Sequence, residues 1–257
     1  MSAKELLMFW IIILELTSIQ KKISNSTSMK KLIKISILLA STVAFVACCC
    51  NKNKCEVAYT PLFNKDLSNA IYDKAVWSID NEGVLSANKD DIIFTKNDYQ
   101  NFELEAEFKL EKKSNSGIII YASDAKDWIP NSLEVQIADN TTKGFDKPYC
   151  RNATIYGHVD TMIDTTVSVG QWNKIKIRAV GQNIDIWLNG KHATKMNMAE
   201  FKDSKTTPTG YQIPPWLVKH KKCEMQTSGK IGFQGKHGKA STYYRNVKIR
   251  PVEKVCK

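Results

Sequence analysis

The chain has 257 residues, of which 43% are hydrophobic and 25% charged, a composition that is ordinary for a globular protein and shows no low-complexity segment. Its formal net charge is +11, but the basic residues are scattered along the chain and few are arginines, so the charge does not predict nucleic-acid binding. This length accommodates a single all-β domain.

The N-terminal region has the pattern of an export signal. From Met29, three lysines precede an uncharged run at 35–47, which is typical of a signal peptide and too short to span a bilayer. Ala47 before Cys48 resembles a bacterial lipobox, in which the cysteine becomes the lipidated first residue of the mature protein. An ordinary signal peptide with cleavage nearby is the alternative. We therefore predict a lipid-anchored protein of the cell envelope, exported from the cytosol.

This interpretation divides the chain into three parts. Residues 1–47 form an upstream extension and a signal peptide, 48–58 a lipidated tether, and 59–253 the folded domain. Four cysteines lie beyond the anchor and are available for disulfides in an oxidising compartment, and their connectivity stays open: Cys55, Cys150, Cys223 and Cys256. No pair has the CxxC spacing of a zinc site.

From Tyr59 onward, short alternating segments bounded by Gly, Asn, Asp or Pro predict strands. In chain order these segments are 101–110, 117–123, 133–139, 174–180, 184–190, 230–234 and 243–252. The Asn189-Gly190 pair predicts a tight hairpin turn. A helical turn is expected only within 195–203, and 204–227 reads as a long polar loop with three prolines, which favours an ordered lid or rim. The pattern predicts one β-sandwich domain.

Several of these motifs, in this order, resemble the DUF1080 family, also called the 3-keto-disaccharide hydrolase domain. They are YTPLFNKDLSNAIY, NFELEAEFKLEKKSNSGIIIY, EVQIADN, QWNKIKIRAVGQNIDIWLNGK and GKIGFQGKHGKASTYYRNVKIRPV. The resemblance runs from about Tyr59 to Val252. It implies a concanavalin A-like jelly-roll β-sandwich, a saccharide substrate, and cleavage of glycosides already oxidised at C3.

The candidate catalytic residues are Glu134 and His237. Glu134 lies in the family motif EVQIADN, and strand alternation places it on the face opposite Leu133 and Val135. His237 lies between two glycines in QGKHGK. The candidate substrate-binding residues are Gln136 and Asp139 near Glu134, Gln234 and Lys236 near His237, Arg245 in the last strand, and Trp128 in a loop where a ring can stack on a sugar. Trp216 is a second loop tryptophan, whereas Trp77, Trp172 and Trp187 are expected in the core.

Cleavage beside a C3 ketone needs a base for the C2 proton and a positive group near the enolate oxygen. Either His237 or Glu134 is suited to be the base. Lys236, Arg245 or a divalent metal held by Glu134, His237 and Asp139 is suited to hold the enolate, the metal being calcium, manganese or zinc. The alternative function is a non-catalytic carbohydrate-binding lipoprotein, because similar sandwiches often only bind.

Overall fold

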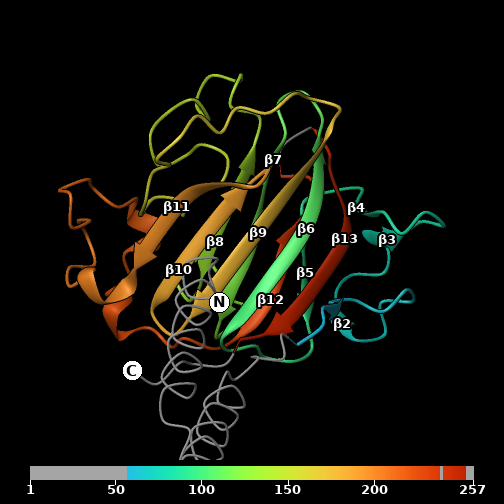
Figure 1. The fold of residues 1–257 in the computed structure, drawn as a ribbon, viewed down its shortest axis with the longest axis horizontal. Coiled ribbons are helices and arrows are strands. Elements are labelled where there is room, and N and C mark those ends of the chain that lie inside the picture. Colours follow the sequence, from blue (N-terminus) through green and yellow to red (C-terminus); the bar gives the residue numbers. More distant parts are fainter. Residues whose placement is uncertain (1–56, 238–239, 253–257) are drawn as a thin grey trace, which may run out of the picture. The chain divides into compact units, whose positions relative to one another are not determined.

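The computed structural model describes residues 57–237 and 240–252, and these form two antiparallel sheets (Figure 1). The eight-stranded sheet has the order β11 (Lys191–Asn197), β10 (Asn183–Leu188), β9 (Trp172–Val180), β6 (Phe102–Leu110), β13 (Thr242–Pro251), β4 (Leu85–Ala87) and β3 (Trp77–Ile79), with β1 (Thr60–Pro61) paired to β13. The five-stranded sheet has the order β2 (Ala70–Ile71), β5 (Ile92–Thr95), β12 (Lys230–Gln234), β7 (Asn115–Ala122) and β8 (Leu133–Ala138).

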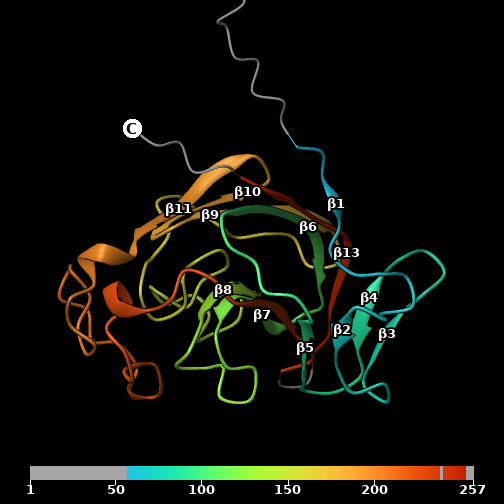
Figure 2. The ribbon, with the colours of Figure 1, turned by 90° about the horizontal axis from the view of Figure 1, so that it is seen from below.

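The eight-stranded sheet arches over the five-stranded sheet, and long loops lie on the far side of the five-stranded sheet (Figure 2). Consecutive strands alternate between the sheets at several points, as in β6 and β7 or β12 and β13. The architecture is a concanavalin A-like jelly-roll β-sandwich, so the expected fold class is confirmed. No described helix is both long enough and apolar enough to cross a membrane.

The predicted strands all form, with their ends displaced by a few residues. The 3-10 helix η1 (Met198–Glu200) lies within the segment expected to make a helical turn, and the long loop contains two more 3-10 turns, η2 (Pro215–Leu217) and η3 (Lys222–Glu224). Strand alternation did not reveal β1 to β5, because these strands have only two to four residues each.

The core lies between the sheets and follows the period of two. Leu133, Val135 and Ile137 of β8 are buried toward the eight-stranded sheet, and so are Ile231 and Phe233 of β12. Two polar side chains also meet in this layer, where the Ser116 and Tyr244 hydroxyls lie 2.6 Å apart and link the two sheets. Side chains of opposite parity on β7, β8 and β12 must therefore point out of the core, toward the loops.

The three strand tryptophans differ in burial. Trp77 is in the core as expected, but Trp172 and Trp187 are only half-buried, on the outer face of the eight-stranded sheet. There cations cover their rings, with the Arg245 guanidinium 4.1 Å from the Trp172 ring and Lys176 Nζ 4.1 Å from the Trp187 ring. The expectation of core positions was wrong for these two, because stacking on a cation lets a ring occupy a wet face.

Several predictions from the sequence fall outside the described residues. These are the upstream extension and signal peptide at 1–47, lipidation of Cys48, most of the tether at 48–58, and any disulfide through Cys55 or Cys256. Cys150 and Cys223 are described, and both are free thiols.

The turn η3 buries a lysine beside a histidine. Lys222 is 1% exposed, and its Nζ has no hydrogen-bond partner among the described residues. Burial lowers the pKa of Lys222 to about 8. His158 is also buried, its Nδ1 lies 2.7 Å from the Tyr156 carbonyl oxygen, and burial together with the Lys222 charge lowers its pKa to about 3. A protonated Lys222 is therefore a cost to the folded state.

Replacing the buried amine should stabilise the protein. The penalty is full below pH 8 and fades as pH rises to 10.5, where the unfolded lysine also loses its proton. We expect Lys222→Met to raise the free energy of unfolding by about 3 kcal/mol at pH 7 and by much less at pH 10. Denaturant titrations at the two pH values measure this difference.

Lys221→Met is the matched control, because Lys221 is exposed and pairs only with Glu224 at the surface. It should leave stability nearly unchanged at both pH values. A Lys222→Met variant that is less stable than the wild type at pH 7 would show that the amine has a stabilising partner.

Candidate functional site

A pocket of about 280 Å³ opens on the outer face of the five-stranded sheet. Its floor comes from β7, β8 and β12, and its walls come from loops that are far apart in the sequence. The lining residues are Asn115, Trp128, Ile129, Glu134, Gln136, Tyr156, Trp216, Leu217, Gln234 and His237. Both candidate catalytic residues thus line one pocket, together with Gln136, Gln234 and Trp128.

Strand register and one glycine position Glu134. In the β7–β8 pair, Gly117 lies opposite Gln136 and Ile119 opposite Glu134. A Cβ atom on Gly117 would lie 2.1 Å from Glu134 Oε1, so the carboxylate group lies directly over the glycine. A real Cβ cannot approach that closely, and only glycine at 117 allows this position of the Glu134 side chain.

The environment of Glu134 favours the neutral acid. Its carboxyl group makes no hydrogen bond and no ion pair with any described residue, and no Lys or Arg is among the lining residues. Burial raises the pKa of Glu134 to about 8. Near neutral pH this group therefore carries a proton and can donate it, as expected for a partly buried carboxyl group without a counter-charge.

His237 is held by a carboxylate from another loop. Its Nδ1 lies 2.7 Å from Asp90 Oδ2, and its backbone pairs with that of Asn115 on β7. The neighbouring Gly235 amide donates to the Asp91 carbonyl at 2.8 Å, which joins the two loops. With Nδ1 bound to a carboxylate, the ring presents Nε2 as its basic nitrogen.

Amide and phenol groups surround this pair. Gln136 Nε2 donates to Asn115 Oδ1 at 3.3 Å, whereas Gln136 Oε1 is buried and has no described partner. The Tyr156 amide donates to the Glu134 carbonyl at 2.9 Å, which places its ring beside Glu134. Burial and the charges of Cys150 and Glu134 raise the pKa of Tyr156 to about 12, so its hydroxyl remains a donor.

Sequence reasoning missed Asn115, Tyr156 and Asp90. Asn115 has the same strand parity as Gly117 in the motif NSG, so alternation would have revealed it once the β7–β8 register was known. Tyr156 lies in a turn that pairs with β8 through Val135 and Ile155, and Asp90 lies in the β4–β5 loop. No local pattern marks these two residues.

Asp139 is a structural residue, contrary to the expectation. Its carboxylate accepts hydrogen bonds from the amides of Lys113 and Thr141 and from the hydroxyls of Thr141 and Thr142, at 2.6 to 3.0 Å. These bonds hold the pKa of Asp139 below its usual value although burial opposes ionisation. The group closes the turn after β8 and does not line the pocket.

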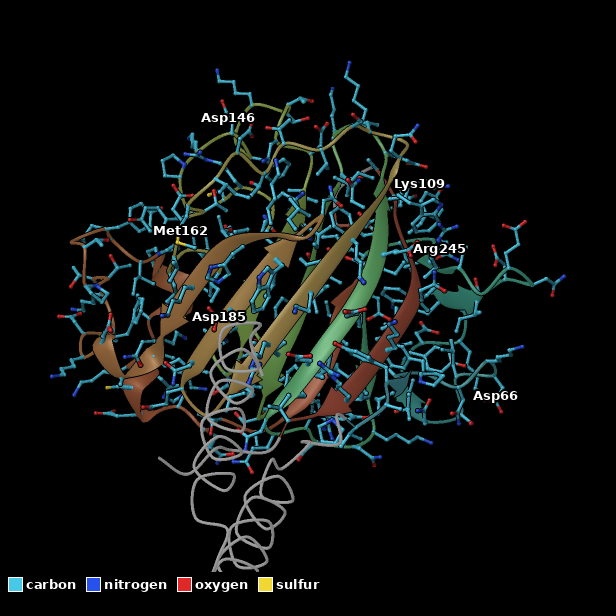
Figure 3. All side chains as sticks on the ribbon, viewed as in Figure 1. Asp66, Lys109, Asp146, Met162, Asp185 and Arg245 are labelled. Atoms are coloured by element: carbon cyan, nitrogen blue, oxygen red, sulfur yellow. The ribbon has the colours of Figure 1, made fainter. Side chains whose placement is uncertain are left out.

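Arg245 and Lys236 do not line the pocket either. Arg245 lies on β13 of the eight-stranded sheet, where Nε donates to Glu107 Oε2 at 2.7 Å (Figure 3). The period of two sends its side chain to the outer face of that sheet, away from the loops over the other sheet. Lys236 is next to His237, but its amide bonds to the Lys89 carbonyl and its charge acts on Glu111. Neither is placed to hold an enolate in this pocket.

The residues present do not fit the expected divalent-metal site. Of the three expected ligands, Asp139 is outside the pocket. Within residues 57–237 and 240–252, no three His, Cys, Asp or Glu side chains are grouped so that they could hold a metal ion. No chemical step below is derived through a metal.

A larger cavity, about 560 Å³, lies along the eight-stranded sheet beside β1. Its two carboxylates are engaged in ion pairs, Glu105 with Lys174 and Lys248, and Glu107 with Arg245. Although burial opposes ionisation, these cations hold the pKa of both carboxyls below the usual value. The smaller pocket is the better site because, among the residues that the structure describes, it places an unpaired acid in the same pocket as an oriented imidazole.

Comparison with known proteins places the chain in a family. Residues 58–250 match the family described as the 3-keto-alpha-glucoside-1,2-lyase-like domain. A crystal structure from Parabacteroides distasonis, described as an inferred glycosyl hydrolase, has 44% sequence identity and a TM-score of 0.74, covering 76% of this chain and 100% of that one. A second structure of the same description and organism has 21% identity and a TM-score of 0.60, covering 76% and 94%, and shows the fold alone. No curated protein matches.

The unpaired acid should make stability depend on pH. Because folding raises the pKa of Glu134 from 4.5 to about 8, ionisation penalises the folded state increasingly as pH rises between these values. Glu134→Gln keeps the shape and removes the charge. We expect it to be neutral at pH 4.5 and to stabilise the protein by about 2 to 4 kcal/mol at pH 8.5, a range reduced for partial exposure of the carboxyl.

Glu107→Gln is the matched control, because Glu107 is paired with Arg245 on the other sheet. It should lower stability slightly at pH 8.5, the opposite sign. Equal effects of the two substitutions in denaturant titrations would mean that Glu134 is not an isolated acid.

Proposed function

The chain belongs to the family of 3-keto-alpha-glucoside-1,2-lyase-like domains, and from this membership and the pocket we propose that it cleaves glycosides oxidised at C3. The family assignment confirms the resemblance found in the sequence, and with the 44%-identical relative it assigns the chain a carbohydrate-active role. The observation that carries the proposal is one pocket with an acid of raised pKa and an imidazole oriented by a carboxylate.

A ketone at C3 makes the neighbouring C2 proton acidic. A base takes this proton, the electrons of the C2–H bond form an enolate with the C3 oxygen, and the enolate then expels the oxygen substituent at C1. The products are a free alcohol and a sugar enone with a C1–C2 double bond. Water then adds across this bond, with hydroxide at C1 and a proton at C2, and the net reaction is hydrolysis. No second carboxylate is required, in contrast to ordinary glycosidases.

His237 is suited to be the base. Asp90 holds its Nδ1, so Nε2 is the nitrogen that can accept the C2 proton. Glu134 is suited to be the acid that gives a proton to the departing C1 oxygen, because its pKa of about 8 keeps it protonated near neutral pH. The two environments thus assign opposite roles to the two groups.

The surrounding polar groups suit the enolate and the hydroxyls. The Tyr156 hydroxyl stays protonated and can donate a hydrogen bond to the developing negative charge on the C3 oxygen. The unpartnered Gln136 Oε1 can accept a hydrogen bond from a sugar hydroxyl. In the hydration step the roles reverse, since the Glu134 carboxylate takes a proton from water and the His237 imidazolium returns a proton to C2, which restores both groups.

The decisive experiment compares a methyl 3-keto-glucoside with its unoxidised parent. We expect turnover of the ketone alone, with a loss of more than 100-fold in kcat for His237→Ala and of at least tenfold for Glu134→Gln. Because Glu134 must be protonated for the first step, kcat should fall as pH rises through about 8, and Glu134→Gln should lose this dependence. His192→Ala is the control, because His192 pairs with Asp185 on the other sheet.

Three results would count against the assignment. A rate that rises through pH 8 would make Glu134 the base instead of the acid. Turnover of the parent but not of the ketone would refute elimination. Saccharide binding without any turnover would favour the alternative of a non-catalytic binding protein, a reading that the exposed Trp216 ring at the pocket also suits.

The proposal includes export and lipid anchoring at Cys48, supported by the lysines and the uncharged run before it. In cells that express the full chain, Cys48→Ala should abolish labelling by a palmitate analogue and shift the protein from the membrane fraction to the soluble fraction. Cys49→Ala is the matched control and should keep both properties. Unchanged labelling of Cys48→Ala would overturn the lipidation site.

A further inference from the structure

The pocket has an apolar rim formed by two loops. Trp128 and Ile129 come from the β7–β8 loop, and Trp216 and Leu217 come from the loop between β11 and β12. Trp216 is 56% exposed and Ile129 42% exposed, whereas Leu217 is 6% exposed and anchors the loop that carries Trp216. Trp216 is the single large aromatic residue with such exposure among the described residues. Exposed apolar side chains gathered beside a polar pocket mark a binding surface.

Both loops are held in place, so the rim exists before a ligand arrives. Lys219 Nζ lies 2.7 Å from Asp127 Oδ2, and His220 Nε2 lies 2.9 Å from Asn131 Oδ1, which ties one loop to the other. Within the β7–β8 loop, the Ser132 hydroxyl donates to the Trp128 carbonyl at 2.7 Å. Such pre-organisation reduces the entropy lost when a ligand binds.

The rim also depends on the turn that carries Tyr156. Gly157 has φ +68°, and a Cβ there would lie 2.6 Å from Leu217 Cδ1 and 3.0 Å from Pro214 Cδ. Only glycine lets η2 pack this closely against the turn. The position of the Trp216 ring is therefore coupled to the turn beside the catalytic pair, and Gly157 is a positioning residue.

The size of the pocket limits what fits beside the catalytic residues. Its volume of about 280 Å³ lies at the lower end for ligand pockets, which run from roughly 300 to 1,000 Å³. A single sugar ring fills such a space. Because the four rim residues line the same pocket as Glu134 and His237, a group attached through the C1 oxygen of the bound ring lies against them.

Charge limits the ligand as well. No Lys or Arg lines the pocket, and Lys219, three residues after Trp216, is already paired with Asp127. A carboxylate or phosphate on the substrate would lose its hydration without gaining a cationic partner. The rim offers ring faces and aliphatic groups instead, which suit the flat apolar face of an uncharged ring.

We propose that Trp128, Ile129, Trp216 and Leu217 form a binding site for the leaving group of the substrate, and that this group is an uncharged ring, either a second neutral sugar or an aromatic aglycone. The assignment of the reacting ring to the inner pocket rests on the proposed function. The rim site itself stands on the exposure of its side chains, the loop ties and the residues that line the pocket.

The binding test uses unoxidised ligands, which do not react. Affinities of methyl glucoside, phenyl glucoside and a glucose disaccharide are measured by titration calorimetry. A disaccharide whose leaving-group ring is glucuronic acid tests the effect of a charge at the rim. We expect the two extended neutral ligands to bind five- to tenfold more tightly than methyl glucoside, and the charged one to lose that gain. Trp216→Ala should remove the gain, and Trp216→Phe should retain most of it.

Trp187→Ala is the matched control, because this tryptophan lies on the other sheet under Lys176. It should leave all affinities unchanged. Equal affinity for methyl and extended ligands in the wild type would overturn the rim site, and so would an equal loss for both kinds of ligand in Trp216→Ala. Absence of binding by every ligand would also count against it.

A kinetic test separates this proposal from the proposed function. With phenyl and methyl 3-keto-glucosides, Trp216→Ala should raise KM five- to tenfold for the phenyl substrate only, with kcat unchanged. Gly157→Ala should also raise KM for the phenyl substrate, because the added Cβ would displace Leu217. If the wild type turns over both substrates with equal KM, the rim fails and the function stands. If it turns over neither but binds extended ligands selectively, the function fails and the rim stands.

Discussion

The candidate site depends on one close approach, the Glu134 carboxyl group lying over the bare backbone of Gly117. This position keeps the acid on the sheet surface without a hydrogen-bond partner or a counter-charge among the described residues, and burial therefore raises its pKa to about 8. Any side chain at 117 would push the carboxylate away. The position of the acid therefore depends on a single glycine on the neighbouring strand.

The two sheets show how the same residue type takes different roles. Glu105 and Glu107 alternate along β6 as Glu134 and Gln136 do along β8, but lysines and arginines of β9 and β13 neutralise the first two. Their carboxyls stay ionised and form ion pairs that join β6 to its two neighbouring strands. The five-stranded sheet offers glycine, amides and apolar rings around its acid instead, so that acid is available for chemistry.

Loops complete the site that the strands begin. The imidazole of His237 is oriented by Asp90, nearly 150 residues earlier in the chain, and the rim is formed by two loops joined through Lys219 and Asp127. The strands supply rigid positions for the acid and the amides, whereas the loops supply the base and the apolar surface. Such a division suits a site that reacts with one ring and holds a second group beside it.

The amino-acid sequence by itself determined the longer strands and the outward face of Glu134, Gln136 and Gln234, because a period of two acts within a few residues, and the family resemblance of its motifs implied the jelly-roll class. Only the tertiary structure decided which polar groups meet. Arg245 and Asp139 have the residue types of a sugar site, yet the first lies on the other sheet and the second closes a turn. Asp90 and Tyr156 carry no local signal, because their roles arise from contacts between segments that only folding brings together.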